Sequence, residues 1–329
     1  MVLGVPVLLG LVLLVLGPLT WVVAGDPVRG LRGKEQVDAL NATRQTVLAA
    51  TGGVVVALGL AYTARTYHLS RRGQVTQRFG AAVGQLSSEK PEERLGGVFA
   101  LEHILAESPQ EHATVVTVLA TYVREHTRRG PRALLAPPDP EADWEAALPG
   151  WGTEPAADVR AAMDVLARRP DRPEPRRLDL RDAHLVGLQM REFEFDTRPR
   201  LTRMFLTRAD LRRADLRGVD LRGSILNGAD LSAARLHGAK LAGVGFSRAR
   251  LCGAGLDGAD LLGAEFDGAD LREVTGLTAA QLSGVVVDDA TVLPEDLAAD
   301  PWVRARKAAC LAWRDAHGPL STPPPTPAP

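Results

Sequence analysis

Apolar residues recur at every fifth position from Leu201 to Leu271, a spacing that fits neither an α-helix nor a β-strand. A small residue such as Ala209 lies two positions before most of these centres, and glycines such as Gly218 follow many of them. To keep the centres on one side, the chain must turn a corner in each five-residue unit, and glycine suits such a corner. Four units would close one coil, and stacked coils would bury a continuous column. The predicted repeat centres are Leu201, Leu206, Leu211, Leu216, Leu221, Leu226, Leu231, Leu236, Leu241, Phe246, Leu251, Leu256, Leu261, Phe266 and Leu271.

The same pattern occurs earlier in another phase, at Leu180, Leu185, Met190 and Phe195. One extra residue near positions 197–199 accounts for the change of phase. We expect Phe195, and Phe193 two positions before it, to point inward like the other centres and small residues. The remaining three positions of each unit are expected to face water.

Two uncharged stretches near the N-terminus predict two transmembrane helices, over 1–24 and 45–64, because about 20 apolar residues cross a bilayer. The alternative for the first stretch is a cleaved signal peptide, but its start, MVLGVPV, lacks a positively charged region. Cationic residues are balanced between the loop and the segment after the second span. Asp26, Glu35 and Asp38 dilute the cations of the loop, and the resemblance given below carries most of the preference, so we expect an integral protein of the cell membrane with both ends, and the repeats, in the cytoplasm.

Helical spacing of apolar residues predicts three further helices, over 74–87, from about Pro91 to Glu107, and from Ser108 onward. The sequence Ser108-Pro109-Gln110-Glu111 predicts a capping box at the start of the third. A Pro-rich linker follows, interrupted by a short helix over 154–168 with Thr153 as its predicted cap.

These patterns together give the predicted domain organisation. It comprises transmembrane helix 1 (1–24), a loop (25–44), transmembrane helix 2 (45–64), a juxtamembrane and small helical domain (65–128), a Pro-rich linker with a short helix (129–177), a repeat β-helix with its closing segment (178–293), a C-terminal helix (294–317) and a disordered tail (318–329).

Composition and motif spacing mainly exclude classes of function and of binding site. Charge is nearly balanced, with 39 Lys and Arg against 40 Asp and Glu, so no global field favours nucleic acid. The two cysteines have no C-x-x-C spacing, and His103, His112 and His126 form no i, i+4 pair that could ligate a metal on one helix face. No nucleophile elbow, phosphate loop or His-carboxylate constellation occurs. We therefore expect no enzymatic activity, metal, cofactor or small-molecule substrate.

The repeat resembles the pentapeptide-repeat family, whose consensus A-(D/N)-L-x-x is present in Ala209-Asp210-Leu211 and in the units centred on Leu216, Leu231, Leu261 and Leu271. The resemblance implies an all-β right-handed quadrilateral β-helix, with residues 277–294 closing the last coil. The whole chain also resembles a group of actinobacterial membrane-anchored pentapeptide-repeat proteins, a likeness of architecture that names no activity.

The sequence predicts a membrane-tethered interaction or scaffolding module with an unidentified protein partner and a possible homodimer. The alternative is a regulator of a nucleic-acid enzyme, because known pentapeptide-repeat proteins bind DNA gyrase by resembling DNA. Nearly equal numbers of acidic and basic residues in the repeats disfavour that alternative. If residues 20 apart stack, Asp220, Lys240 and Asp260 form a ladder of alternating sign, which also disfavours it. Direct nucleic-acid binding by Arg208 and the neighbouring arginines is disfavoured because no aromatic residues are interleaved with them.

Overall fold

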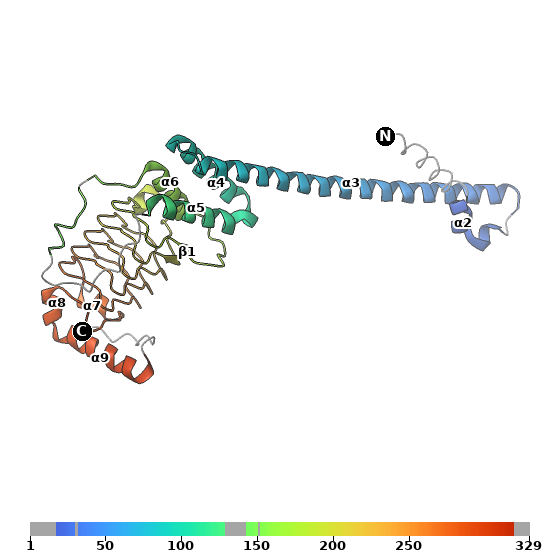
Figure 1. Cartoon of the computed structure of the whole chain (residues 1–329). Coiled ribbons are helices and arrows are strands. Elements are labelled where there is room, and N and C mark those ends of the chain that lie inside the picture. Colours follow the sequence, from blue (N-terminus) through green and yellow to red (C-terminus); the bar gives the residue numbers. More distant parts are fainter. Residues whose placement is uncertain (1–17, 30–31, 129–142, 151, 319–329) are drawn as a thin grey trace. The chain divides into compact units, whose positions relative to one another are not determined.

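The computed structural model describes residues 18–29, 32–128, 143–150 and 152–318 (Figure 1). The chain divides into two compact units, residues 1–76 and 77–329. Most of the first predicted membrane span, part of the predicted linker and nearly all of the predicted tail lie outside the described residues.

The described part of the first unit is helical. Helix α2 is Thr20–Arg29, with a non-helical residue, Gly25, inside it, and helix α3 is Lys34–Leu86, which continues past the unit boundary. The prediction of a loop over 25–44 and of separate helices over 45–64 and 74–87 was wrong, because one helix covers residues 34–86. No proline occurs between Pro27 and Pro91, so no missing backbone N–H breaks that stretch.

One segment of α3 has the properties of a membrane span. Among the described residues, only Lys34–Tyr67 is long and apolar enough to cross a bilayer. Its apolar side chains are exposed in the structure, with Val56, Leu58 and Leu60 between 62% and 67% accessible.

Three helices pack together in the second unit: α4 (Pro91–Glu107), α5 (His112–Thr127) and α6 (Ala157–Arg168). Leu101, Leu119 and Leu166, one from each helix, are fully buried. Asp158 of α6 accepts hydrogen bonds from Arg94 Nε at 2.5 Å and from the Tyr122 hydroxyl at 2.6 Å. Helix α6 is therefore part of the helical layer, whereas the sequence had placed it in a linker.

The starts of α5 and α6 differ from prediction for local reasons. Ser108 makes no side-chain cap bond, and its backbone N–H, which Glu111 would need for a capping box, donates to Ile104 O at 2.9 Å and closes α4; a 3₁₀ turn, η2 (Pro109–Glu111), then precedes α5. Helix α6 begins three residues after the predicted start, since Pro155 disfavours helical backbone at Glu154. The Thr153 hydroxyl instead donates to Gly150 O at 2.9 Å.

Residues 178–292 form stacked coils. Strands β1 (Leu178–Asp179) and β2 (Met204–Phe205) pair in parallel, and single-residue parallel bridges then recur every five residues. From Arg200 onward the partners are 20 residues apart until the closing segment, as in Arg200↔Asp220 and Gly255↔Thr275. Each coil therefore holds four five-residue segments.

The first coil is longer than the others. Leu178 pairs with Met204 and His184 with Asp210, so this coil has 26 residues and its insertion is six residues, not one. A 3₁₀ turn, η3 (Glu192–Glu194), lies in the insertion. Phe193 is 69% exposed, so its predicted inward position was wrong. A five-residue period cannot distinguish one extra residue from six, which is why the sequence misplaced this segment.

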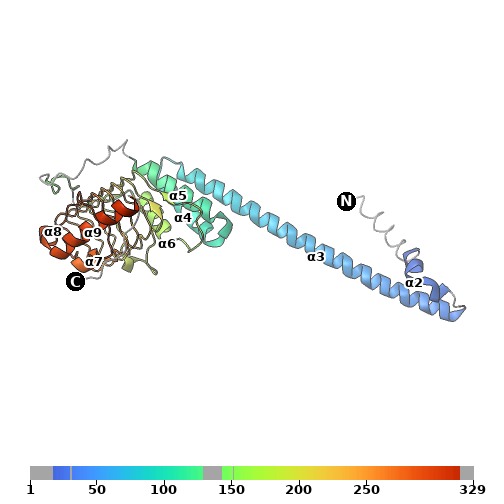
Figure 2. The same ribbon diagram turned by 90° about the horizontal axis from the view of Figure 1, so that it is seen from below.

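Helices cover both ends of the stack (Figures 1 and 2). At the first coil, buried Arg169 donates to Leu166 O at 2.6 Å and to Arg200 O at 2.7 Å, and Arg200 N donates to Ala167 O at 2.9 Å. These bonds join α6 to the coil.

At the last coil, Val286 and Val292 extend the ladder, and α7 (Ala279–Leu282) begins at a complete capping box. Two helices follow where one was predicted over 294–317: α8 (Glu295–Ala299) and α9 (Pro301–His317). They separate at Asp300, whose carboxylate caps α9. Buried Arg306 of α9 donates to Val285 O at 2.9 and 3.1 Å, which fixes α9 on the coil.

Candidate interaction surface

The fifteen predicted repeat centres lie inside the coils, each at most 2% exposed. Phe246 and Phe266 stack in adjacent coils, with ring centroids 4.9 Å apart and planes 3° from parallel. These side chains form the core of the stacked coils. The surface of the coils is therefore formed by the other positions of each five-residue unit.

Asp-Leu-Arg turns form a large part of that surface. In the turn at Leu216, Arg217 donates to both oxygens of Asp215 at 2.8 Å. The same bidentate pair recurs in four further turns of the described coils: Asp179–Arg181, Asp210–Arg212, Asp220–Arg222 and Asp270–Arg272. The pairs were missed from sequence, although the recurring D-L-R triplet was visible.

Four of these aspartates, Asp210, Asp215, Asp220 and Asp270, are buried, contrary to the expectation that their positions face water. Asp215 is 2% exposed and Asp270 is 1% exposed. In the Asp270 turn, the backbone N–H of Arg272, two residues ahead, donates to the carboxylate at 3.2 Å. Short side chains that accept from nearby backbone N–H groups stabilise turns, so this aspartate supports both the corner and the surface pair.

Electrostatics keeps these aspartates charged. Burial alone would raise the pKa of Asp215, Asp220 and Asp270, but hydrogen bonds from the arginines two residues ahead outweigh it and hold each pKa below its usual value. The carboxylates are therefore ionised and paired at neutral pH.

Residues 20 apart do stack, as in Asp220↔Lys240 and Lys240↔Asp260. The contact between coils is nevertheless longer than the contact within a turn. Asp215 lies 3.5 Å from Arg235 of the next coil but 2.8 Å from Arg217. The alternating ladder is thus secondary to pairing inside each turn.

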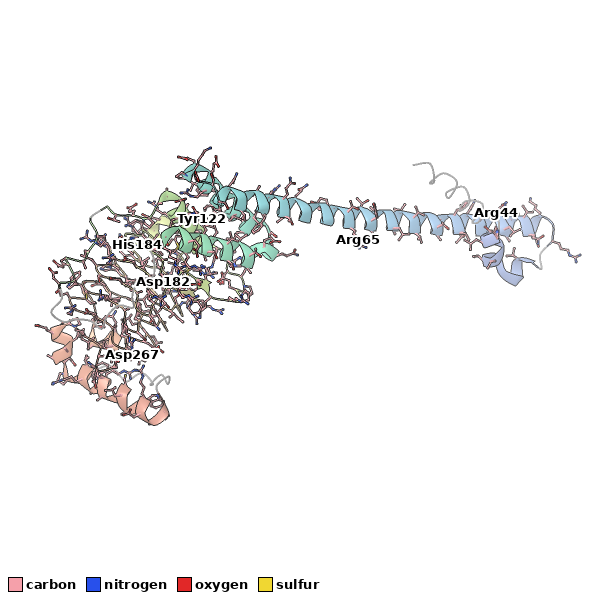
Figure 3. All side chains as sticks on the ribbon, viewed as in Figure 1. Arg44, Arg65, Tyr122, Asp182, His184 and Asp267 are labelled. Atoms are coloured by element: carbon pink, nitrogen blue, oxygen red, sulfur yellow. The ribbon has the colours of Figure 1, made fainter. Side chains whose placement is uncertain are left out.

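The basic cluster identified in the sequence is compensated. Arg208 donates to both oxygens of Asp182 at 2.6 and 2.7 Å, and Asp182 is labelled in Figure 3. Arg212, Arg217 and Arg222 belong to the turn pairs already described. Because a carboxylate faces each of these four guanidinium groups, four of the five arginines of the cluster, which also includes Arg213, lack the uncompensated charge that phosphate backbones require.

The six-residue insertion stands out on this paired surface. Phe193 is more exposed than Leu262 (59%) or Phe99 (48%), the other large exposed apolar side chains described in the second unit. Arg191 and Arg217 lie 5.7 and 5.5 Å from its ring centroid. The backbone N–H of Glu192 donates to Arg217 O at 3.0 Å and ties the insertion to the next coil.

The histidines considered for a metal site lie apart in different settings. His103 pairs with Glu107 at 3.0 Å, buried His112 lies 3.3 Å from Glu174, and His126 contacts Tyr122 O at 2.9 Å. Within the part of the chain that the structure describes, no group of three His, Cys, Asp or Glu residues is placed to hold a metal ion.

The family described as "Pentapeptide repeats" matches in 8 copies, over residues 198–228, 205–243, 229–261 and 245–275. No curated protein matches.

Several solved structures are similar to the chain. Rfr23, a pentapeptide-repeat protein from the cyanobacterium Cyanothece 51142, is 28% identical, covers 35% of this chain and 90% of its own, and has a TM-score of 0.30. QnrB1, a plasmid-mediated fluoroquinolone resistance protein, is 17% identical over 44% of this chain and 85% of its own, with a TM-score of 0.23. HetL, from Nostoc sp. strain PCC 7120, is 24% identical over 37% and 75%, with a TM-score of 0.13. These TM-scores are too low for a function to be inferred from the similar structures. The repeat matches, with the five-residue bridges and 20-residue coils, show that residues 198–275 of this chain are pentapeptide repeats.

Proposed function

We propose that this protein is a membrane-tethered, non-enzymatic module for protein–protein interaction. In this proposal two N-terminal spans hold it in the cell membrane, and a right-handed quadrilateral coil presents a rigid surface in the cytoplasm. The fifteen buried centres serve as structural positions. The partner is a protein, and no small-molecule substrate is turned over.

The exposed ring of Phe193 carries this proposal. An aromatic side chain that is 69% exposed loses favourable burial unless another surface covers it. It is flanked by Arg191 and Arg217, and aromatic and arginine residues together are enriched at the energetic centres of protein interfaces. The surrounding Asp–Arg turns are internally paired and suit the polar rim of such a contact.

Site-specific photocrosslinking in cells tests the interaction. A photoreactive residue at position 193 should give a discrete adduct with one protein, whereas one at Leu262, an exposed apolar position elsewhere on the coils, should not. Phe193→Ser, combined with a crosslinker at the neighbouring Glu194, should remove the adduct while leaving thermal unfolding unchanged. Adducts of equal yield at positions 193 and 262, or insensitive to Phe193→Ser, would contradict the proposal.

The apolar segment of α3 supports the tether. Its 34 residues exceed the length of a bilayer span, and most of its large apolar side chains, among them Val56, Leu58 and Leu60, are exposed in the structure. The full chain should resist alkaline extraction from membranes, and Leu58→Arg with Leu60→Arg should release it or reduce its level. Release of the wild-type chain by alkali, or a reporter after Pro329 that is active only outside the cytoplasm, would contradict the tether or its orientation respectively.

The alternative, regulation of an enzyme such as DNA gyrase by surface mimicry, requires a strip of uncompensated negative charge. The buried aspartates of the Asp-Leu-Arg turns are each paired with an arginine, so the geometry favours the interaction module. Inhibition of gyrase supercoiling by the purified chain would favour the mimicry alternative over the interaction module.

A further inference from the structure

A hollow of about 640 Å³ lies between α5 and the first coils. Val116 and Ala120 of α5 line one wall, and residues of the chain entering the first coil and of the second coil line the other. We call this hollow the arginine cleft, because five arginines line it: Arg124, Arg176, Arg177, Arg181 and Arg203. Its volume is in the range of small-molecule sites, about 300–1,000 Å³.

The cleft has more positive than negative charge. Its two carboxylates are Asp179 and Glu174, and Glu174 is already bonded to buried Arg169 at 2.6 Å. Asp179 is shared by Arg124 at 2.5 Å and Arg181 at 2.8 Å. A bond from Arg181 lowers the pKa of Asp179 to about 2, so one full negative charge serves two guanidinium groups.

Two of the cations lie close to one aromatic ring. The guanidinium carbons of Arg177 and Arg181 are each 5.8 Å from the centroid of Phe205. The Arg177 guanidinium also donates a hydrogen bond to the backbone oxygen of Gly223. That oxygen has no formal charge, so it does not neutralise the positive charge of Arg177. Like charges held in one hollow repel each other, and an anion bound there would remove that cost.

The remaining arginines face solvent at the cleft. Arg176 and Arg203 are exposed, so each can reorient toward a ligand. Guanidinium groups match the bidentate geometry of phosphate oxygens better than other side chains do. The opposite wall is largely apolar, with the short side chains of Ala113, Val116 and Ala120 beside Thr117 and Thr121, and offers a surface for a flat ring.

We propose that the arginine cleft binds a nucleoside polyphosphate, with its phosphates on Arg176 and Arg203 and its base between Phe205 and the apolar wall of α5. The protein does not consume this ligand; the cleft joins the helical layer to the coils, so binding would strengthen their contact. This site is separate from the Phe193 surface, and its failure would leave the proposed interaction module intact.

Titration calorimetry on the full chain in mild detergent tests the proposal, with ATP and GTP as probes. Wild-type protein should bind at least one of them saturably, and Arg203→Glu should weaken binding at least about tenfold, or about 1.4 kcal/mol. The matched control is Arg248→Glu, because Arg203 and Arg248 occupy the same position after a repeat centre, with φ of 56° and 57°, and both are exposed. Arg248→Glu should leave affinity unchanged.

Two further variants keep the test decisive if Arg203→Glu unfolds. Arg176→Glu lies before the first coil and should weaken binding to a similar extent, and Phe205→Leu should weaken ATP more than pyrophosphate. Absence of saturable binding at millimolar ATP and GTP would overturn the proposal. Equal weakening by Arg203→Glu and Arg248→Glu, or equally tight binding of pyrophosphate and ATP, would do so as well.

Discussion

Deleting residues 192–197 should leave the coils intact, because it removes the six-residue excess of the first coil. Ten residues separate Met190 from Leu201 in the chain, and four separate successive centres in the regular coils. The deletion restores the regular spacing, while Leu201 remains the fourth centre of the first coil.

The expected cost follows from the contacts that are lost. Two of the backbone hydrogen bonds, from Glu194 N and Phe195 N, are local to the deleted turn, and the one that joins the insertion to another coil is Glu192 N to Arg217 O at 3.0 Å, worth about 1 kcal/mol. Two exposed ion pairs, Arg198–Glu192 and Arg191–Glu194, contribute up to about 1 kcal/mol each. Shortening the loop from ten residues to four recovers about 0.8 kcal/mol of closure entropy. The net loss should therefore not exceed about 2 kcal/mol.

Urea unfolding of the full chain in detergent, followed by circular dichroism, measures this loss. The control is a deletion of residues 192–199, which leaves two residues before Leu201 and should pull that side chain, now 2% exposed, out of the stack. If Phe195 formed a wall of the coil, as the sequence suggested, the six-residue deletion would remove a whole wall. Losses of equal size for the two deletions would refute the 26-residue coil.

Three further changes test the coils. Leu231→Ala, at a fully buried centre, should lower the free energy of unfolding by about 2–5 kcal/mol in urea titrations. Gly238→Ala should cost about 1 kcal/mol by the same assay, since φ is 64° and nothing within 4 Å would touch the new methyl group; an unchanged midpoint would contradict the left-handed corner. The pKa of Asp270 is lower in the folded state than the unfolded value of about 3.9, so its stabilisation is present above about pH 4 and is lost as pH falls toward the folded pKa. Asp270→Asn should therefore reduce the acid sensitivity of unfolding, and a pH profile parallel to that of the wild type would exclude this role.

The sequence predicted the coils well because their signal is periodic. Leucines five residues apart can share one buried axis only if the chain turns repeatedly, so the inward positions followed from spacing alone. Local signals also identified the residues of α4 from Pro91 to Glu107. Tertiary context, by contrast, decided where α6 lies, because Asp158 must meet Arg94 and Tyr122 from other helices.

Features that depend on counting or on side-chain reach could not be derived in the same way. A five-residue period does not change when a whole five-residue unit is added, so the sequence predicts inward positions for Phe193 and Phe195. The surface pairs, such as Asp215–Arg217, were read as ladders between coils because only the stacking distance was considered. The arginine cleft brings together residues from α5 and two coils that lie far apart along the chain, so no single motif marks it.

The helices at both ends of the stack have a consequence for self-association. A parallel ladder that ended in unpaired backbone groups would be a template on which further chains could add, and growth would continue into filaments. Arg169 occupies carbonyls at one end, and Arg306 occupies Val285 O at the other. A chain truncated after Leu293 would expose one end only, because α6 and Arg169 still cover the other, and should therefore associate in pairs, whereas the intact protein keeps both ends covered.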